Sequence, residues 1–351
     1  MQDANSDRPA NIVNILNADD GKESAGIYTY QVGKGVGLEG DLGATFVVLK
    51  PGTRFSPPYA RESCDELIFC LAGEGLVWQD GQTYTLSPGD CGGWKSGTGI
   101  SHTLINDSNG YGQEGSDLLI FLVYETRPEV TEAIYWPFGP PESPEGRSVA
   151  NQWSNPPPRG DIDMHPALPR KPLSGEPVDV PHPRLEYRAT NIVNGPDSTD
   201  SVGQGELAAE ATSLSQETSL SGRFGCNLEI LAPGCRSSDP HAHSLEDELV
   251  YVISGRGLLW MNGIVYDIGP GDAIGFPAGT GIAHTIINDS SEEDGEDLAL
   301  LVVGQNKRDE GDLVYYPLHK EKMFTFVRWW FDAPQHDLGP HNGRAARYKD
   351  D

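Results

Sequence analysis

The stretch that decides the fold is LEILAPGCRSSDPHAHSLEDELVYVISGRGLLWMNG, which runs from Leu228 to Gly263. It has a counterpart in FVVLKPGTRFSPPYARESCDELIFCLAGEGLVWQDG, which runs from Phe46 to Gly81. The copies align without a gap, and a second block follows in register: SPGDCGGWKSGTGISHTLINDS at 87–108 matches GPGDAIGFPAGTGIAHTIINDS at 269–290. An internal repeat of this length predicts two domains of one architecture.

Each copy consists of short strand-like segments. ELIFCLAG and ELVYVISG are apolar runs, rich in β-branched and aromatic residues, that end in glycine. GLVWQDGQTYTLSPGD and GLLWMNGIVYDIGPGD each combine two strands around a DG or NG hairpin turn. Because long apolar strands need their edges covered, we expect each copy to close into a barrel. The sequence therefore predicts an all-β protein with two tandem barrels.

The repeat and the proline content divide the chain into four parts. We expect a first barrel over 10–138, a proline-rich linker over 139–185, a second barrel over 186–335 and a polar tail over 336–351. The linker contains Pro156-Pro157-Pro158, so it is neither a continuous helix nor a central strand, and it wraps one barrel or bridges the two. The aromatic segment Phe324–Phe331 docks on a barrel face or a partner subunit, and we expect the last dozen residues to be disordered.

The second copy carries four residues of the types that bind transition metals. His241 and His243 are two positions apart, so on a strand both point into the barrel, where Glu248 and His284 join them. Three imidazoles and a carboxylate suit a divalent ion of intermediate hardness and leave positions open for water or substrate. We expect one divalent transition metal per chain, Fe(II) or Mn(II) in preference to zinc, nickel or cobalt.

The first copy has lost this set. Tyr59 and Arg61 stand where the second copy has its first two histidines, while Glu66 and His102 are kept. A guanidinium is permanently cationic and cannot ligate a metal, so we expect Arg61 to occupy the place of the cation and to pair with Glu66. The alternative is an anion- or substrate-binding pocket made by Tyr59, Arg61 and His102.

Other candidates lie around the second set. Asp239, Ser238 and Glu246 border the ligand turn, and we expect them to transfer protons or to orient the ligands. Arg236 precedes the first ligand strand and could hold a substrate carboxylate at the barrel mouth. Arg54 occupies its place in the metal-free copy, however, which favours a structural role. Tyr251 has the opposite strand parity to the ligand Glu248, which predicts a packing role on the other face of the sheet.

The pattern G…HxHxxxxE……G, followed by G…PxG…H…N, resembles the two signature motifs of the cupin superfamily. The resemblance covers both copies and implies two jelly-roll (double-stranded β-helix) barrels, with His241, His243, Glu248 and His284 on the metal-ligand positions of the family. The layout is similar to that of the bicupins, which include oxalate decarboxylases, quercetin and gentisate-type dioxygenases and many uncharacterised members.

This reading predicts a metal-dependent enzyme that acts on a small organic molecule. The leading class is dioxygenase-type oxidative cleavage of a hydroxylated aromatic, enol or keto acid. The alternative is a non-redox isomerase, lyase, cyclase or decarboxylase, in which the metal acts as a Lewis acid beside one base. A further alternative is a non-catalytic cupin that binds a small molecule.

Charge and composition restrict the partners. The formal net charge of −27 repels phosphate backbones and anionic lipids, so we expect neither nucleic acid nor membrane as a partner. The first ten residues lack the basic flank and apolar run of a secretory signal, and the five cysteines are odd in number without a CxxC spacing. These features predict free thiols and a cytoplasmic location, and barrels of this kind favour a homodimer.

Overall fold

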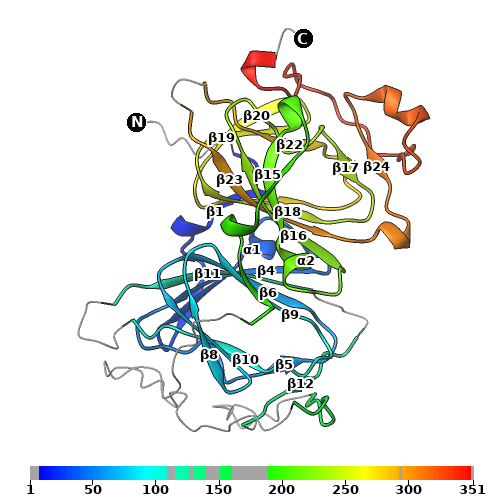
Figure 1. Cartoon of the computed structure of the whole chain (residues 1–351). Helices are drawn as coiled ribbons and strands as arrows, with labels where there is room; N and C mark the ends of the chain where they lie inside the picture. The colour runs from blue at the N-terminus through cyan, green and yellow to red at the C-terminus, as the bar shows by residue number, and fades with distance from the viewer. Residues whose placement is uncertain are drawn as a thin grey trace.

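Short apolar strands alternate with glycine turns along both copies, and in the computed structural model they form two β-barrels (Figure 1). The structure describes residues 8–108, 115–125, 130–138, 151–159, 189–291 and 295–348. The all-β prediction is confirmed, because the α-helices in these ranges are two single turns, α1 (Val32–Gly35) and α2 (Leu214–Glu217). Within the same ranges, no helix has the length and apolar character needed to span a membrane.

The first barrel has a seven-stranded sheet of order β13-β9-β6-β11-β4-β3-β2, a three-stranded sheet β10-β7-β8 and the pair β12-β5. The predicted DG hairpin joins β7 to β8, with Asp80 and Gly81 both at positive φ as a two-residue turn requires. The bounds are β2 (Lys22–Ser24), β3 (Ile27–Gln31), β4 (Leu42–Leu49), β5 (Ala60–Arg61), β6 (Glu66–Ala72), β7 (Gly75–Gln79), β8 (Gln82–Leu86), β9 (Asp90–Trp94), β10 (His102–Ile105), β11 (Leu118–Glu125), β12 (Ile134–Tyr135) and β13 (Ile192–Asn194).

The second barrel repeats this arrangement, with sheets β1-β21-β18-β23-β16-β15-β14, β20-β19-β22 and β17-β24. Its strands are β1 (Ile12–Asn14), β14 (Asp200–Val202), β15 (Ala209–Ser213), β16 (Phe224–Leu231), β17 (Ala242–His243), β18 (Glu248–Ser254), β19 (Gly257–Met261), β20 (Ile264–Ile268), β21 (Asp272–Phe276), β22 (His284–Ile287), β23 (Leu298–Gln305) and β24 (Val314–Tyr315). The 3-10 turns are η1 (Ile15–Asn17), η2 (Pro196–Ser198), η3 (Gly205–Leu207), η4 (Arg308–Glu310), η5 (Lys320–Phe324) and η6 (Ala346–Tyr348).

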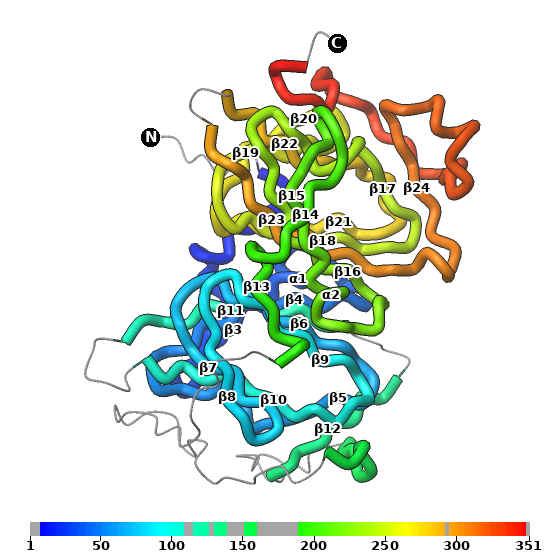
Figure 2. The backbone as a smooth tube through the Cα atoms, in the orientation of Figure 1, coloured from blue at the N-terminus to red at the C-terminus, as the bar shows by residue number. Residues whose placement is uncertain are grey.

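The two barrels exchange their first strands. β1 lies within the range predicted for the first barrel, yet it pairs with β21 of the second, and β13 pairs in the same way with β9 of the first. Both strands come from the same tetrapeptide, NIVN, at 11–14 and at 191–194. The leading asparagine anchors each strand, because Asn11 donates a side-chain hydrogen bond to the Gly275 carbonyl and Asn191 donates one to the Gly93 carbonyl. In Figure 2 the segment that carries β13 begins beside β9 of the lower barrel and continues into the upper one.

Apolar side chains fill each barrel and also the surface between the barrels. The first interior includes Val47 and Ile120, and the second includes Val252 and Leu300. A third cluster takes side chains from the outer faces of both large sheets. There, Tyr251 stacks on Phe121 of the first barrel, with ring centroids 5.0 Å apart, which confirms its predicted packing role.

Parts of the linker and the whole described tail pack on the barrels. The Trp153 amide donates to the Ile134 carbonyl of the first barrel. The rest of the linker predicted over 139–185, outside 151–159, is not among the described residues. Trp329 and Trp330 are buried against the second barrel, whereas Phe331 is 75% exposed. The expected disorder of the last dozen residues is wrong up to residue 348, since Ala345 is buried among apolar side chains of this barrel.

Candidate metal centre

Backbone pairing brings the four predicted ligands together inside the second barrel. His241 and His284 form an antiparallel bridge, in which each backbone amide donates to the carbonyl of the other residue. His243 follows on β17, and Glu248 opens β18, whose alternate residues Val250 and Val252 also face the barrel interior. The two-residue spacing of the first histidines therefore places both rings on one side of the chain.

The ring nitrogens converge on one carboxylate. His284 Nε2 lies 3.0 Å and His241 Nε2 3.7 Å from Glu248 Oε2, and His243 Nε2 lies 4.0 Å from Glu248 Oε1. The candidate ligand atoms of His241, His243 and Glu248 all lie within 4.8 Å of one another. This grouping has the size of a first coordination sphere around a single ion.

The opposite nitrogen of each imidazole is held by the protein. His241 Nδ1 lies 2.9 Å from the Asp239 carbonyl and 3.2 Å from Ser238 Oγ, and His243 Nδ1 lies 2.7 Å from Asp312 Oδ2. His284 Nδ1 faces the Ile282 carbonyl at 3.4 Å. Carbonyl and carboxylate acceptors keep the proton on Nδ1, so the Nε2 lone pairs point at the centre, as metal-ligating histidines require.

The residues fit a divalent metal. Glu248 Oε2 is buried and accepts no hydrogen bond from the described residues, although three Nε2 atoms surround the carboxylate. Lone pairs on all sides of a buried carboxylate repel one another, and a cation at their centre removes that repulsion. Burial lowers the pKa of His284, which stacks on Phe276 at 3.4 Å between ring centroids, and so favours the neutral imidazole that binds metals.

The matching place in the first barrel is filled by protein groups. Arg61 Nε donates to Glu66 Oε2 at 2.7 Å, which is the predicted pair. The Tyr59 hydroxyl donates to Glu66 Oε1 at 2.5 Å, and His102 Nε2 lies 3.1 Å from the same oxygen. Both carboxylate oxygens are therefore satisfied, and the guanidinium supplies the positive charge that a metal would bring.

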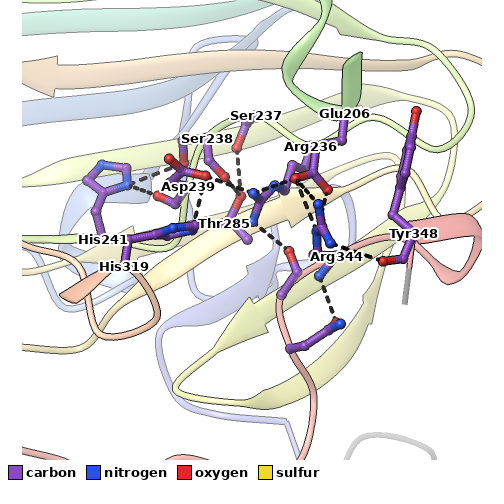
Figure 3. A network of polar contacts seen from close by, with 12 residues as sticks. Glu206, Arg236, Ser237, Ser238, Asp239, His241, Thr285, His319, Arg344 and Tyr348 are labelled. Carbon is purple, nitrogen blue, oxygen red and sulfur yellow. Dashed lines mark hydrogen bonds and ion pairs between the residues drawn. The ribbon is translucent and has the colours of Figure 1, made fainter. Parts of the chain in front are cut away.

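The prediction that Arg236 meets substrate at the barrel mouth is wrong. Arg236 is 3% exposed, and its guanidinium binds Glu206 Oε1 at 2.9 Å, Asp239 Oδ1 at 2.7 Å and the Gly343 carbonyl at 3.0 Å. Figure 3 shows this arginine between the two carboxylates, with Arg344 on the far side of Glu206. Because two carboxylates and a carbonyl bind the guanidinium at the same time, Arg236 belongs to a structural network.

The two predicted acids have different surroundings. The Asp239 carboxylate takes part in the same network and also contacts His319 of the C-terminal segment (Figure 3). Lys322 of the same segment binds it as well, so only the backbone carbonyl of Asp239 serves the centre. Glu246 Oε2 lies 3.4 Å from His243 Nδ1, while its Oε1 accepts the Lys307 amide at 2.8 Å. Both residues orient histidines, and neither carboxylate is placed among the four ligands.

Sequence reasoning missed two carboxyl groups near the centre. Asp312, which is fully buried, accepts from His243 and from a backbone amide of the ligand turn. Its counterpart in the first barrel, Glu132, also accepts from a backbone amide of the corresponding turn. The sequence did contain a signal for this pair, because an acid stands two residues before IYWP in the first copy and before VYYP in the second. Glu229 lies on the interior face of β16, where the first barrel has Val47; burial, reinforced by the negative charge of Glu248, raises its pKa to about 7.

Comparison with known proteins agrees with the fold of two cupin barrels. The model of the cupin domain matches twice, at residues 45–112 and 227–303. The chain is a two-domain protein of the cupin superfamily. No curated protein matches it in sequence.

Solved structures similar to the chain include oxalate decarboxylases. One, described by its substrate binding mode and reaction specificity switch, has a TM-score of 0.53 and 14% identity over 93% of this chain and 87% of that one. The Bacillus subtilis enzyme at pH 4.6 gives 0.51 and 14% over 90% and 81%. A study of the Mn(II) centres of the Bacillus subtilis enzyme gives 0.51 and 14% over 93% and 87%. At this identity the likeness concerns the fold.

Proposed function

We propose that the second barrel is the catalytic centre of a divalent-metal-dependent enzyme that acts on a small organic acid. The observation that carries the proposal is the convergence of three Nε2 atoms on the Glu248 carboxylate, with each Nδ1 facing an acceptor. A site that only stored or bound a molecule would not need three oriented imidazoles around an unsatisfied buried carboxylate. His241, His243, Glu248 and His284 would hold the ion, with Mn(II) or Fe(II) favoured.

Within this proposal, proton-transfer chemistry such as decarboxylation or isomerisation has the stronger support. Glu229 faces the barrel interior, and its raised pKa of about 7 lets the carboxyl carry a proton near neutral pH. The resemblance of the fold to oxalate decarboxylases agrees with that class. The bound metal would supply Lewis-acid polarisation of a substrate oxygen. Oxidative cleavage by a dioxygenase is the competing class.

Metal analysis and gas exchange test the proposal. Protein purified without chelators or nickel resin should contain about one transition-metal ion per chain. His241→Ala should lose that ion and all turnover while keeping the fold. His102→Ala, which removes the histidine of the first-barrel cluster, is the control and should keep the ion. Metal that stays at full stoichiometry in His241→Ala would contradict the assignment.

Gas measurements separate the two reaction classes. Loaded enzyme incubated with small keto, hydroxy and dicarboxylic acids should release carbon dioxide or give an isomer without net oxygen uptake. Stoichiometric oxygen consumption would instead assign the centre to the dioxygenase class.

A further inference from the structure

The interior wall of the second barrel lacks a tyrosine that fills the first. In the first barrel, Tyr124 at the end of β11 lies opposite Gly43 of β4, and a Cβ added to that glycine would overlap the tyrosine ring. The ring continues toward β3, where its hydroxyl donates to Gln31 Oε1 at 3.3 Å. The Arg61 guanidinium lies 5.7 Å from the centre of the ring. Tyrosine and arginine together occupy the mouth-side interior of this barrel.

The second barrel has two glycines at the same place. Gly304 of β23 stands where the first barrel has Tyr124, and it pairs directly with Gly225 of β16. A Cβ added to Gly225 would meet only a backbone carbonyl, at 4.0 Å. The position that the Tyr124 ring occupies beside Gly43 is therefore free of side chains beside Gly225.

This open volume adjoins the metal centre. A Cβ on Gly304 would lie 3.6 Å from Glu248 Cγ and 3.9 Å from Glu248 Oε1, because Glu248 pairs with Gly304 from the other side of β23. A molecule seated on the two glycines would thus touch the ligand carboxylate at one end.

The other end of the volume is polar. Ser213 of β15 stands where the first barrel has Gln31, and it pairs across the strands with Asn227. Their neighbours Leu214 and Leu228 point outward, into the cluster between the barrels. Because successive strand residues face opposite sides, Ser213 and Asn227 face the barrel interior. Among the described residues, neither side chain makes a hydrogen bond, whereas the corresponding Thr45 accepts one from Gln31. Interior polar groups without protein partners are free to bind a ligand or water.

We propose that Gly225, Gly304, Ser213 and Asn227 form a substrate subsite for a flat organic acid about as large as a tyrosine ring. The acid group faces the metal, and a distal hydroxyl or carbonyl meets Ser213 and its cross-strand pair Asn227, much as the Tyr124 hydroxyl meets Gln31, the counterpart of Ser213, in the first barrel. The inference rests on the proposed function, since it assumes a metal beside Glu248. It adds the shape of the substrate and the residues that select it.

The test uses Mn(II)-loaded full-length protein and three probes measured by calorimetry. The probes are oxalate, 2-hydroxybenzoate and 2,4-dihydroxybenzoate, which differ in the ring and in the distal hydroxyl. Gly304→Tyr should keep its metal and its oxalate affinity within about threefold, but weaken 2-hydroxybenzoate at least about tenfold by filling the subsite. Asn227→Ala should remove the preference for the second hydroxyl. Ile264→Tyr, at a position 52% exposed outside the barrel, is the matched control and should bind like wild type.

Three results would overturn the subsite. They are no binding of either benzoate by metal-loaded wild type, unchanged benzoate affinity in Gly304→Tyr, and equal loss of oxalate and benzoate affinity in that variant. Gly304→Ala guards against misfolding, since its Cβ finds ordinary van der Waals distances, and it should give an intermediate effect. Absence of metal from wild type would instead refute the proposed function, so metal content is measured first.

Discussion

At the scale of single residues, the two barrels show what two substitutions can do to a shared framework. Glu66 and Glu248 occupy equivalent strand positions, and each lies next to an equivalent histidine. Arg61 satisfies the first carboxylate from within the chain, while His243 leaves the second available to an ion. A tyrosine and an arginine in place of two histidines therefore change a metal site into a structural ion pair with an added hydrogen bond.

Asp312 is predicted to set the metal affinity without touching the metal. Asp312→Asn keeps the size of the side chain but weakens the acceptor that holds His243 Nδ1 at 2.7 Å. We expect about 10- to 100-fold weaker metal binding with the fold retained. Competition with a chromophoric chelator measures it, and Glu132→Gln in the first barrel serves as the matched control. Equal affinities of Asp312→Asn and wild type would contradict the role.

Glu66 gives the first barrel a defined acid sensitivity. Burial raises the pKa of Glu66, but the charge of Arg61 and the contacts with His102 and Tyr59 outweigh it and lower the pKa to about 2, from 4.5. A depressed pKa stabilises the fold above the unfolded value and loses that contribution as the pH falls through the folded one. Between pH 4.5 and 2, the free energy of unfolding should therefore fall by about 3 kcal/mol on account of this residue.

Urea unfolding across this pH range measures the effect. The double variant Arg61→Met with Glu66→Gln replaces the pair by uncharged groups. Its free energy of unfolding should fall less steeply with decreasing pH, because the contribution of Glu66 is gone and only the other carboxylates titrate. Parallel profiles for the variant and wild type would show that the pair does not control the acid sensitivity.

At the scale of the elements, strand parity and the repeat predicted most of the fold and the ligand set. The HxH spacing predicted that His241 and His243 lie together. The odd sequence separation between Glu248 and Tyr251 predicted that Tyr251 points out of the barrel. The orientation of Arg236 could not be predicted in this way, because Glu206 and Gly343 reach it from segments far away in the sequence. The interior role of Asn227 likewise required knowing which face of β16 turns inward.

The C-terminal tail should stabilise the second barrel. Deleting residues 336–351 removes the Gly343 carbonyl from Arg236 and the Arg344 guanidinium from Glu206, and it uncovers the apolar surface beneath Ala345. Loss of partners to buried charged groups costs about 2 kcal/mol, so the Tm should fall by about 4–8 °C. Differential scanning calorimetry tests this, with Arg344→Ala expected to give a smaller shift. An unchanged Tm after the deletion would contradict the role of the tail.

At the scale of the whole molecule, the exchanged strands make the barrels mutually dependent. A fragment 1–188 lacks β13 and leaves the edge of β9 open, and a fragment 189–351 lacks β1 beside β21. Because open apolar edges aggregate, each fragment expressed alone should be insoluble or markedly less stable, and co-expression should restore a soluble pair. Size-exclusion chromatography checks this. Full-length protein cut once within 160–188 should stay associated, while stable separate fragments would contradict the dependence.

The same exchange imposes an order on synthesis. Translation delivers β1 long before its partner β21, so residues 12–14 emerge from the ribosome with no surface to join until residue 276 has followed. The first barrel in turn waits for residues 192–194 before β9 is covered. The first barrel can therefore close only after residue 194 has been made, and the second only after residue 276. Chaperones that shield nascent strands would have their longest engagement with the amino-terminal half.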